Sequence, residues 1–283
     1  MADLTGKTVL ITGATSGIGF ETSVRLAQLG ASLVMVGRDR AKTAAKVEEV
    51  GKRSGAASVE SLLCDFSSQD RIRGLANEFR ARHERLHILV NNAGGVFAKR
   101  KLTVDGIETT FAINHLGYFL LTSLLLDLLV KSAPARLINV ASAAHYRGTM
   151  DFDDLGFERG YKIMRAYSRS KLANVLFTRE LAARMDGMGV TFNSLHPGAV
   201  ATNIWNGGPR WTRPILILAR LFMLTPAQGA DAVVYLAVSP EVEGKTGLYF
   251  EDNHPKAPSA LASDSSVAKQ LWDRSSKLVK SGA

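Results

Sequence analysis

The residues Thr12-Gly13-Ala14-Thr15-Ser16-Gly17-Ile18-Gly19 follow an apolar run, Lys7 to Ile11, and lead directly into a helical pattern. Three glycines let the chain turn sharply and let a ligand approach the backbone closely. The free amides and the dipole of the following helix favour a phosphate there. The spacing is G-x3-G-x-G rather than the commoner G-x-G-x-x-G, and glycines alone also fit an ordinary structural turn. The strand–turn–helix context favours a phosphate-binding turn.

Short apolar runs alternate with helical patterns along most of the chain. Parallel strands that are covered on both faces have this unpatterned apolar character. We expect strands at 7–11, 32–36, 59–63, 88–90, 137–140, 190–195 and 247–250. We expect helices at 17–29, 40–53, 69–83, 106–130, 167–185 and 226–238. The alternation predicts an α/β fold with one domain over residues 1–283. That domain is a Rossmann-type, doubly wound parallel sheet of about seven strands with helices on both faces.

One segment, 203–225, interrupts this alternation with Gly207-Gly208-Pro209, two tryptophans and several arginines. Long irregular insertions in compact domains are usually functional. We expect a substrate lid here, and weigh an oligomer contact or a simply packed helix as equal alternatives. After about residue 256, a C-terminal tail (256–283) is expected to end in a short amphipathic stretch.

Composition excludes several classes of protein. The chain has 283 residues, of which 46% are hydrophobic and 22% charged, enough for a sizeable core. The single cysteine, Cys64, rules out an internal disulfide, suits a reducing compartment and lies in an apolar run typical of a buried thiol. No His, Asp or Glu cluster has metal-ligand spacing, so no metal is predicted.

The net charge of +9 comes from dispersed basic residues without interleaved aromatic side chains. This pattern predicts no nucleic-acid partner and favours a surface that attracts anionic cofactors. The N-terminus lacks the pattern of a signal peptide, and the apolar segments 117–130 and 214–224 are shorter than the roughly 20 residues of a membrane span. We therefore expect a cytoplasmic protein without an integral membrane anchor.

The end of the second predicted strand holds Gly37 and then Arg38. An acidic residue usually binds the ribose hydroxyls of NAD at this place. A guanidinium instead forms charge-assisted bonds with a 2′-phosphate, so Arg38 favours NADP(H). Asp39 is the counter-evidence, and we interpret it as the N-cap of the next helix.

Tyr167 and Lys171 lie four residues apart on a predicted helix and share one face. An ammonium one turn away should lower the pKa of the phenol and make it a usable acid or base. Taken alone, such a pair is common on surface helices. Its weight comes from Ser142, which follows a strand, and from Asn114, a polar residue inside the long apolar helix. Asn114 is either a satisfied core asparagine or a backbone-bound residue that holds a water near Lys171.

Together these residues resemble the short-chain dehydrogenase/reductase superfamily. The motifs are Thr12 to Gly19, Asn91-Asn92-Ala93-Gly94, Asn114, Ser142, Tyr167, Lys171 and Pro197-Gly198. Within it, the chain is similar to the retinol dehydrogenase-like branch. The shared features are Gly37-Arg38-Asp39, Thr103 to Glu108, Asn114 to Phe119, His196 to Gly198 and Ser239 to Gly244. The separation between Ser142 and Tyr167 is longer than usual, but the inserted segment 151–165 is familiar in this branch.

The resemblance implies a catalytic tetrad. Tyr167 would protonate the carbonyl oxygen as the nicotinamide delivers hydride, and Ser142 would hold that oxygen. Lys171 would bind the nicotinamide ribose, and Asn114 would support a proton-relay water. The implied cofactor-binding residues are Gly13, Thr15, Ser16, Gly17, Ile18, Gly19, Arg38, Asp65, Phe66, Asn92, Ala93, Gly94, Tyr167, Lys171, Pro197, Gly198, Val200 and Thr202.

The expected substrate is a small lipophilic aldehyde, ketone or alcohol. Its contacts are assigned to Ser142, His145, Tyr146, Tyr167, Trp205 and the 151–165 insertion. Relatives pair through helices that correspond to 106–130 and 167–185, which implies a homodimer or homotetramer. We expect no N-terminal anchor of the kind that many animal members have, while the arginines of 203–225 suit transient contact with a membrane surface. The alternative is a non-catalytic NADP-binding regulator on the same fold.

Overall fold

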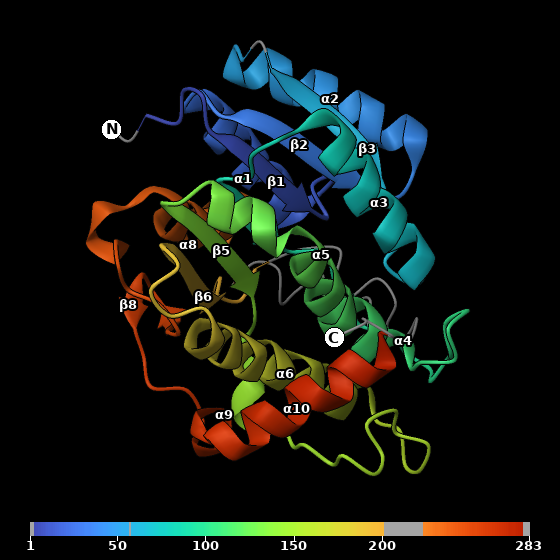
Figure 1. The fold of residues 1–283 in the computed structure, drawn as a ribbon. Helices are drawn as coiled ribbons and strands as arrows, with labels where there is room; N and C mark the ends of the chain where they lie inside the picture. The colour runs from blue at the N-terminus through green and yellow to red at the C-terminus, as the bar shows by residue number, and fades with distance from the viewer. Residues whose placement is uncertain (1–2, 57, 201–222, 280–283) are drawn as a thin grey trace.

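The computed structural model describes residues 3–56, 58–200 and 223–279, and contains one eight-stranded sheet (Figure 1). Its strands are β1 (Thr8–Thr12), β2 (Ser32–Gly37), β3 (Val59–Leu63), β4 (Ile88–Asn91), β5 (Ala135–Val140), β6 (Val190–His196), β7 (Tyr249–Glu251) and β8 (His254–Pro255). The strand order is β3-β2-β1-β4-β5-β6-β7-β8. Every pair from β3 to β7 is parallel, which confirms the predicted fold class, whereas β8 is an additional antiparallel edge strand.

Helices cover both faces of the sheet, and each face has its own apolar core. One layer consists of α1 (Gly17–Gln28), α2 (Arg40–Ser54) and α8 (Pro226–Val238). The opposite layer consists of α3 (Gln69–Arg82), α5 (Gly117–Lys131) and α6 (Ile163–Arg184). The order of the strands reverses between β1 and β4, so the carboxyl ends of β1, β4, β5 and β6 open a crevice where α/β proteins bind ligands.

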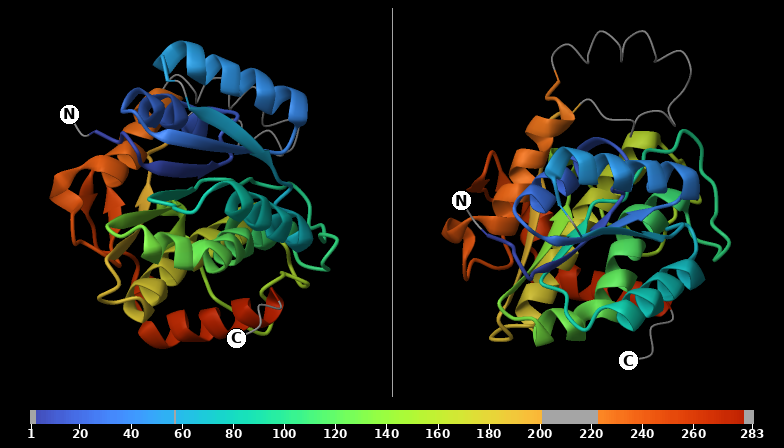
Figure 2. Two further views of the ribbon diagram at one scale, coloured as in Figure 1. Left: turned by 45° about the horizontal axis from the view of Figure 1, so that its top comes forward. Right: turned by 90° about the horizontal axis from the view of Figure 1, so that it is seen from above.

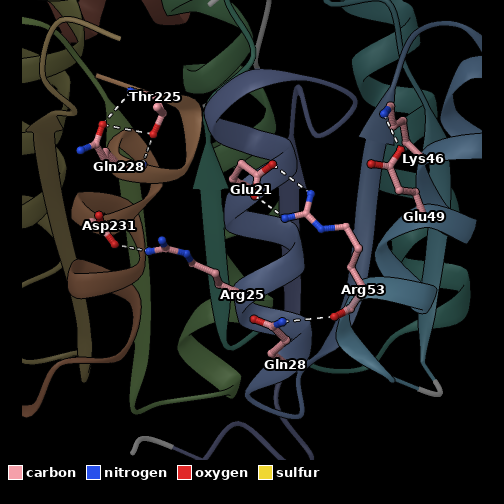
Figure 3. Close-up of polar contacts among 9 residues, drawn as sticks. All are labelled: Glu21, Arg25, Gln28, Lys46, Glu49, Arg53, Thr225, Gln228 and Asp231. Carbon is pink, nitrogen blue, oxygen red and sulfur yellow. Dashed lines mark hydrogen bonds and ion pairs between the residues drawn. The ribbon is translucent and has the colours of Figure 1, made fainter. Parts of the chain in front are cut away.

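Helix α1 is fixed to both of its neighbours by ion pairs (Figure 3). Arg53 of α2 forms two hydrogen bonds with Glu21, of 2.8 and 3.0 Å, and Arg25 of α1 pairs with Asp231 of α8. At the start of α8, Thr225 and Gln228 form a reciprocal capping box. These contacts hold the helix that begins at the glycine turn.

The helix expected at 106–130 is divided into three parts. Glu108 caps α4 (Thr109–Phe111) by accepting hydrogen bonds from two backbone amides, and a π-helix, η1 (Ala112–Leu116), joins α4 to α5. The continuous stretch Thr109–Lys131 is long and apolar enough to cross a membrane, which corrects the shorter span counted from sequence. In this structure 67% of its most apolar window is buried, as in the core helix of a globular domain.

The C-terminal tail is more ordered than its composition indicated. It forms α9 (Ala260–Ser263) and α10 (Ser265–Leu278), and α10 lies against the outer side of α6 (Figure 2). Trp272 of α10 packs against Phe119 of α5 and Phe177 of α6, with ring centroids 5.0 and 6.0 Å apart. Helix α10 therefore covers part of the helical surface to which the resemblance assigned subunit pairing, and pairing there stays a prediction.

Candidate active site

The glycine turn packs against the end of β4. A Cβ atom on Gly13, where φ is +65°, would lie 2.9 Å from the Cα of Ala93. A Cβ on Gly19 would lie 2.4 Å from the Nδ2 of Asn92. The Asn92 side chain donates hydrogen bonds to the carbonyls of Thr12 and Gly13, at 2.9 and 3.2 Å. Asn92 thus fixes the shape of the turn, in addition to the cofactor contact that the sequence predicted for it.

One cavity of about 400 Å³ extends from this turn to the catalytic helix. Predicted site residues that line it are Gly13, Thr15, Ser16, Gly17, Ile18, Asn92, Ala93, Gly94, Ser142, Tyr167, Lys171, Pro197, Gly198 and Val200. They come from five separate segments of the chain, and the carboxyl ends of the parallel strands bring them together. The fold therefore joins the phosphate-binding turn and the Tyr–Lys pair in a single site.

The cavity fits a dinucleotide at its glycine end. Ser16 is the N-cap of α1, yet its side chain makes no capping hydrogen bond, so the first amides of the helix face the cavity without a side-chain acceptor. The absence of side chains at Gly13 and Gly19 lets the turn pack directly against Asn92 and Ala93, which fixes the position of these amides. Both features suit a phosphate held by backbone amides.

The catalytic side of the cavity is built from β5 and α6. Ser142 follows β5 and caps the short 3-10 helix η2 (Ala143–Arg147), because its Oγ accepts the amide of Ala144 at 3.1 Å. Tyr167 and Lys171 lie in the second and third turns of α6 and are 7% and 2% exposed. The Lys171 Nζ donates to the Val140 carbonyl at 2.7 Å. The strand end thus fixes both the serine and the lysine.

Burial dominates the acid–base properties of the pair. It raises the pKa of Tyr167 to about 12, and a hydrogen bond with Ser142 opposes that rise. Burial lowers the pKa of Lys171 to about 7. The expectation of a depressed tyrosine pKa is therefore wrong for this structure, because loss of solvation outweighs the hydrogen bond with Ser142. Tyr167 is in its neutral, proton-donating form at pH 7.

Asn114 lies in the π-helix η1 and is fully buried, outside the lining of the cavity. Its Oδ1 accepts the Gly95 amide at 2.8 Å, and its Nδ2 donates to the Gly95 carbonyl at 3.0 Å and to the Ser170 hydroxyl at 3.1 Å. The side chain is thus bound to backbone, as one of the two sequence interpretations required. π-Helical turns are frequent at functional sites. The role of Asn114 with a water stays a prediction.

Several predicted cofactor residues lie outside the cavity lining. Gly19 is buried beneath the turn, and the exposed side chain of Arg38 follows Gly37 at the end of β2. Asp65 accepts hydrogen bonds from the amide and hydroxyl of Ser67, and Phe66 packs in the core. The N-cap interpretation of Asp39 is confirmed, since its carboxylate accepts the Lys42 amide at 2.7 Å.

His145 does not face the cavity. It is fully buried, its Nδ1 lies 2.8 Å from the Ser142 carbonyl, and its Nε2 accepts the Ser259 amide at 3.3 Å. The ring stacks on Tyr146 and Tyr249, at 4.0 and 4.6 Å. This placement does not match the predicted substrate contact, because both ring nitrogens are engaged in holding η2 against the C-terminal segment.

The 151–165 insertion packs against α6 rather than around the cavity. Arg169, 2% exposed, donates to the carbonyls of Thr149 and Asp154 and lies over the Phe157 ring, 3.7 Å from its centre. Of the residues from 151 to 165, none lines the cavity except Met164. Within this insertion, the substrate contact expected from sequence is therefore limited to Met164. Thr202, Trp205 and residues 203–222 of the expected lid lie outside the described residues.

The cavity also contains residues without a predicted role, which are Val140, Ala141, Ala144, His196 and Ala199. Met164 and Met223, which line it too, belong to the insertion and to the lid predicted to contact substrate. His196 belongs to the His-Pro-Gly motif and ends β6, so its position at a strand end was a usable signal. The described ranges contain no group of three or more His, Cys, Asp or Glu residues that could hold a metal ion.

Comparison with known proteins agrees with this site. Residues 7–212 match the family model for short chain dehydrogenases. Human retinol dehydrogenase 14 is 43% identical over 290 residues, which cover 97% of this chain and 86% of that protein.

Two solved structures are also similar. The crystal structure of an uncharacterized protein from Mycobacterium paratuberculosis has 31% identity and a TM-score of 0.81, and the match covers 99% of this chain and 96% of that one. The Pseudomonas aeruginosa RhlG/NADP active-site complex has 27% identity and a TM-score of 0.70, over 88% and 95% of the two chains. The glycine turn, the matched family model and the 43% identical relative show that this chain belongs to the short-chain dehydrogenase/reductase family of oxidoreductases.

Proposed function

We propose that this protein reduces a lipophilic aldehyde or ketone with NADPH, or oxidises the corresponding alcohol with NADP. The observation that carries this proposal is the single cavity that joins the glycine turn to Ser142, Tyr167 and Lys171. A proton donor and a dinucleotide cradle on the same cavity are what carbonyl reduction requires. A purely regulatory NADP-binding protein would not need the Ser–Tyr–Lys arrangement.

NADPH, when held between the glycine turn and Lys171, would supply the hydride for the carbonyl carbon. The Ser142 hydroxyl binds and orients the carbonyl oxygen, and the Tyr167 hydroxyl donates its proton to that oxygen. The raised pKa of Tyr167 keeps this proton in place before the reaction. Lys171, with its Nζ 5.7 Å from the centre of the Tyr167 ring, stabilises the phenolate that remains.

The proposed preference for NADP(H) rests on Arg38 and on the absence of a carboxylate at Gly37. A Cβ on Gly37 would lie 2.6 Å from Thr15, so the end of β2 passes directly beside the glycine turn. Arg38, the next residue, is exposed and follows this strand end, outside the cavity lining. The RhlG/NADP complex provides a related chain with this cofactor.

We expect Arg38→Asp to shift preference from NADP towards NAD. The substituted carboxylate would repel a 2′-phosphate and accept hydrogen bonds from the ribose hydroxyls of NAD. We expect NADPH affinity to fall at least about tenfold, as for the loss of one charge-assisted contact. Fluorescence titration with NADPH and NADH measures both affinities. An unchanged NADPH affinity in Arg38→Asp would contradict the proposed role of Arg38 in binding the 2′-phosphate.

The substrate class follows from apolar residues on the reacting side of the cavity, among them Ala144, Met164 and Met223. Several similar proteins are retinol dehydrogenases, so retinal and retinol are the first candidates. The expected cytoplasmic location and the homo-oligomer are parts of this proposal that need separate measurement.

The proposal is tested by following NADPH and NADH oxidation with retinal, steroid, quinone, polyketide and simple aromatic carbonyls. We expect NADPH-dependent turnover with at least one lipophilic carbonyl. Tyr167→Phe is the matched control, because it removes only the donated proton. It should reduce kcat by about 10³-fold or more while NADPH affinity is kept. Absence of turnover across the panel would favour the regulator, and an active Tyr167→Phe variant would contradict the mechanism.

A further inference from the structure

The buried ammonium of Lys171 lies between two tyrosine rings. Its Nζ is 5.7 Å from the ring centre of Tyr167 and 5.9 Å from that of Tyr118. Tyr167 has a role in the proposed reaction, whereas Tyr118 has none. Tyr118 is the second residue of α5, one turn after Asn114, and its side chain is 0% exposed.

Tyr118 approaches the Lys171 ammonium with its aromatic ring rather than with its hydroxyl. Its hydroxyl is buried and has no hydrogen-bond partner within residues 3–56, 58–200 and 223–279. A buried hydroxyl in this state destabilises a fold, so packing alone would be served better by phenylalanine. The ring, in contrast, lies within the distance at which an aromatic face attracts a cation.

Lys171 needs such support because little else around it favours its charge. Desolvation is the cause of its lowered pKa, and no carboxylate among the described residues opposes that effect. Its surroundings are the Val140 carbonyl on β5, the Tyr167 ring on its own helix and the Tyr118 ring on α5. Attraction between a cation and an aromatic face is stronger when the pair is desolvated.

We propose that Tyr118 is a positioning residue that holds Lys171 in its ammonium form through the face of its ring. Its importance for catalysis rests on the proposed function, in which a charged Lys171 stabilises the Tyr167 phenolate. The charge state itself can be measured without turnover, so the two proposals can fail separately.

The test is an NMR titration of the full chain labelled with ¹³C at lysine Cε. Lys171→Met identifies the Lys171 signal by its disappearance. We expect Tyr118→Leu to lower the pKa of Lys171 by about one unit, the size of a desolvated cation–aromatic interaction. Tyr118→Phe keeps the ring and should leave the titration unchanged. If Tyr118→Leu does not fold, Tyr118→Met provides the same loss of the ring with an unbranched side chain.

Phe119→Leu is the matched control for loss of a buried ring. Phe119 is the next residue of α5, is 1% exposed and packs against Phe177 and Trp272 rather than the lysine. It should destabilise the fold without moving the Lys171 titration. An unchanged Lys171 pKa in Tyr118→Leu would overturn the proposal. A shift in Tyr118→Phe as large as that in Tyr118→Leu would also overturn it, because the effect would then belong to the hydroxyl.

A second readout is the pH profile of kcat/KM for carbonyl reduction. In Tyr118→Leu the fall of activity on the basic side should move to lower pH by the same amount as the NMR titration, and in Phe119→Leu it should not move. A wild-type chain without turnover would defeat the proposed function, whereas the NMR titration would still decide the role of Tyr118.

Discussion

The two helical layers of this protein differ in where they place their charges. In the layer of α1, α2 and α8, ion pairs such as Arg25–Asp231 lie at the surface, with side chains 33% and 53% exposed. The layer of α3, α5 and α6 has surface ion pairs as well, such as Arg80–Asp127, but charged side chains also lie inside on this side of the sheet. The buried Lys, Arg, Asp and Glu residues of the described chain are Arg169 and Lys171 of α6 and Glu108, which caps α4.

Buried polar atoms on the α6 side are also less well satisfied. The hydroxyl of Tyr118 has no hydrogen bond within the described ranges, and the buried side chain of Asn174 meets only the imidazole of His115. On the α1 side, the hydroxyl of Thr22 is the corresponding case. Unpaired polar groups are costly, and proteins keep them mainly where function requires them. One layer therefore serves mainly to hold the glycine turn, and the other carries the chemistry at a cost in stability.

The largest expected effect comes from removing the buried charge in Lys171→Met. The pKa of Lys171 is about 7 in the folded chain, below its ordinary value of 10.5. Between these values the unfolded chain binds more protons, so folding becomes more favourable as pH rises. The cost of burying the charge is complete below pH 7 and disappears as pH rises towards 10.5.

Wild-type unfolding free energy, relative to Lys171→Met, should therefore rise by about 1.4 kcal/mol per pH unit across that window. Urea denaturation of both chains at a series of pH values measures this difference. All other titrating groups are common to the two chains, so their contributions cancel in the difference between the two unfolding free energies. Parallel curves for the two chains would show that Lys171 is not buried as a cation and would weaken the contrast between the layers.

Arg169 offers a second way to test the cost of charge on the α6 side. Arg169→Met keeps an apolar stem but removes the hydrogen bonds to the 149–154 segment and the contact with the Phe157 ring. We expect a loss of about 2–3 kcal/mol in the free energy of unfolding. Arg165→Met is the control, because Arg165 is exposed and its guanidinium lies 5.6 Å from the same ring. Equal losses in the two variants would contradict the special role of the buried guanidinium.

Much of the fold could be predicted because its strands are continuous apolar runs. β3 and α8 have the predicted bounds, and β2 extends only one residue further. The predicted helix 106–130 differs from the structure at two places. Glu108 caps its start locally, so the helix begins at Thr109, and Asn114 binds the backbone of Gly95 where the helix is divided. The second contact joins distant parts of the chain, so the sequence pattern does not show it. β8 pairs with β7 over two residues, which is too short to leave a pattern in sequence.

The candidate site was predictable where motifs act locally. The glycine turn, Ser142 and the Tyr167–Lys171 pair each lie at a strand end or on one helix face, which sequence spacing shows directly. The position of His145 outside the cavity lining was not predictable, because its ring is engaged by Ser259 and Tyr249, more than a hundred residues further along the chain. The environment that raises the pKa of Tyr167 comes from packing, and so does the ring of Tyr118 beside Lys171.

The smallest expected effect lies in the α1 layer, at Arg25 and Asp231. Their ion pair is solvent-exposed, so its coupling energy should be about 0.2–1 kcal/mol and should fall at high salt. A double-mutant cycle with Arg25→Met and Asp231→Asn, measured by urea denaturation at low and high salt, gives this value. A coupling well above that range, insensitive to salt, would mean that α1 depends on its charges as α6 does. A weak coupling would instead show that the apolar core beneath α1, rather than its ion pairs, holds the glycine turn in place.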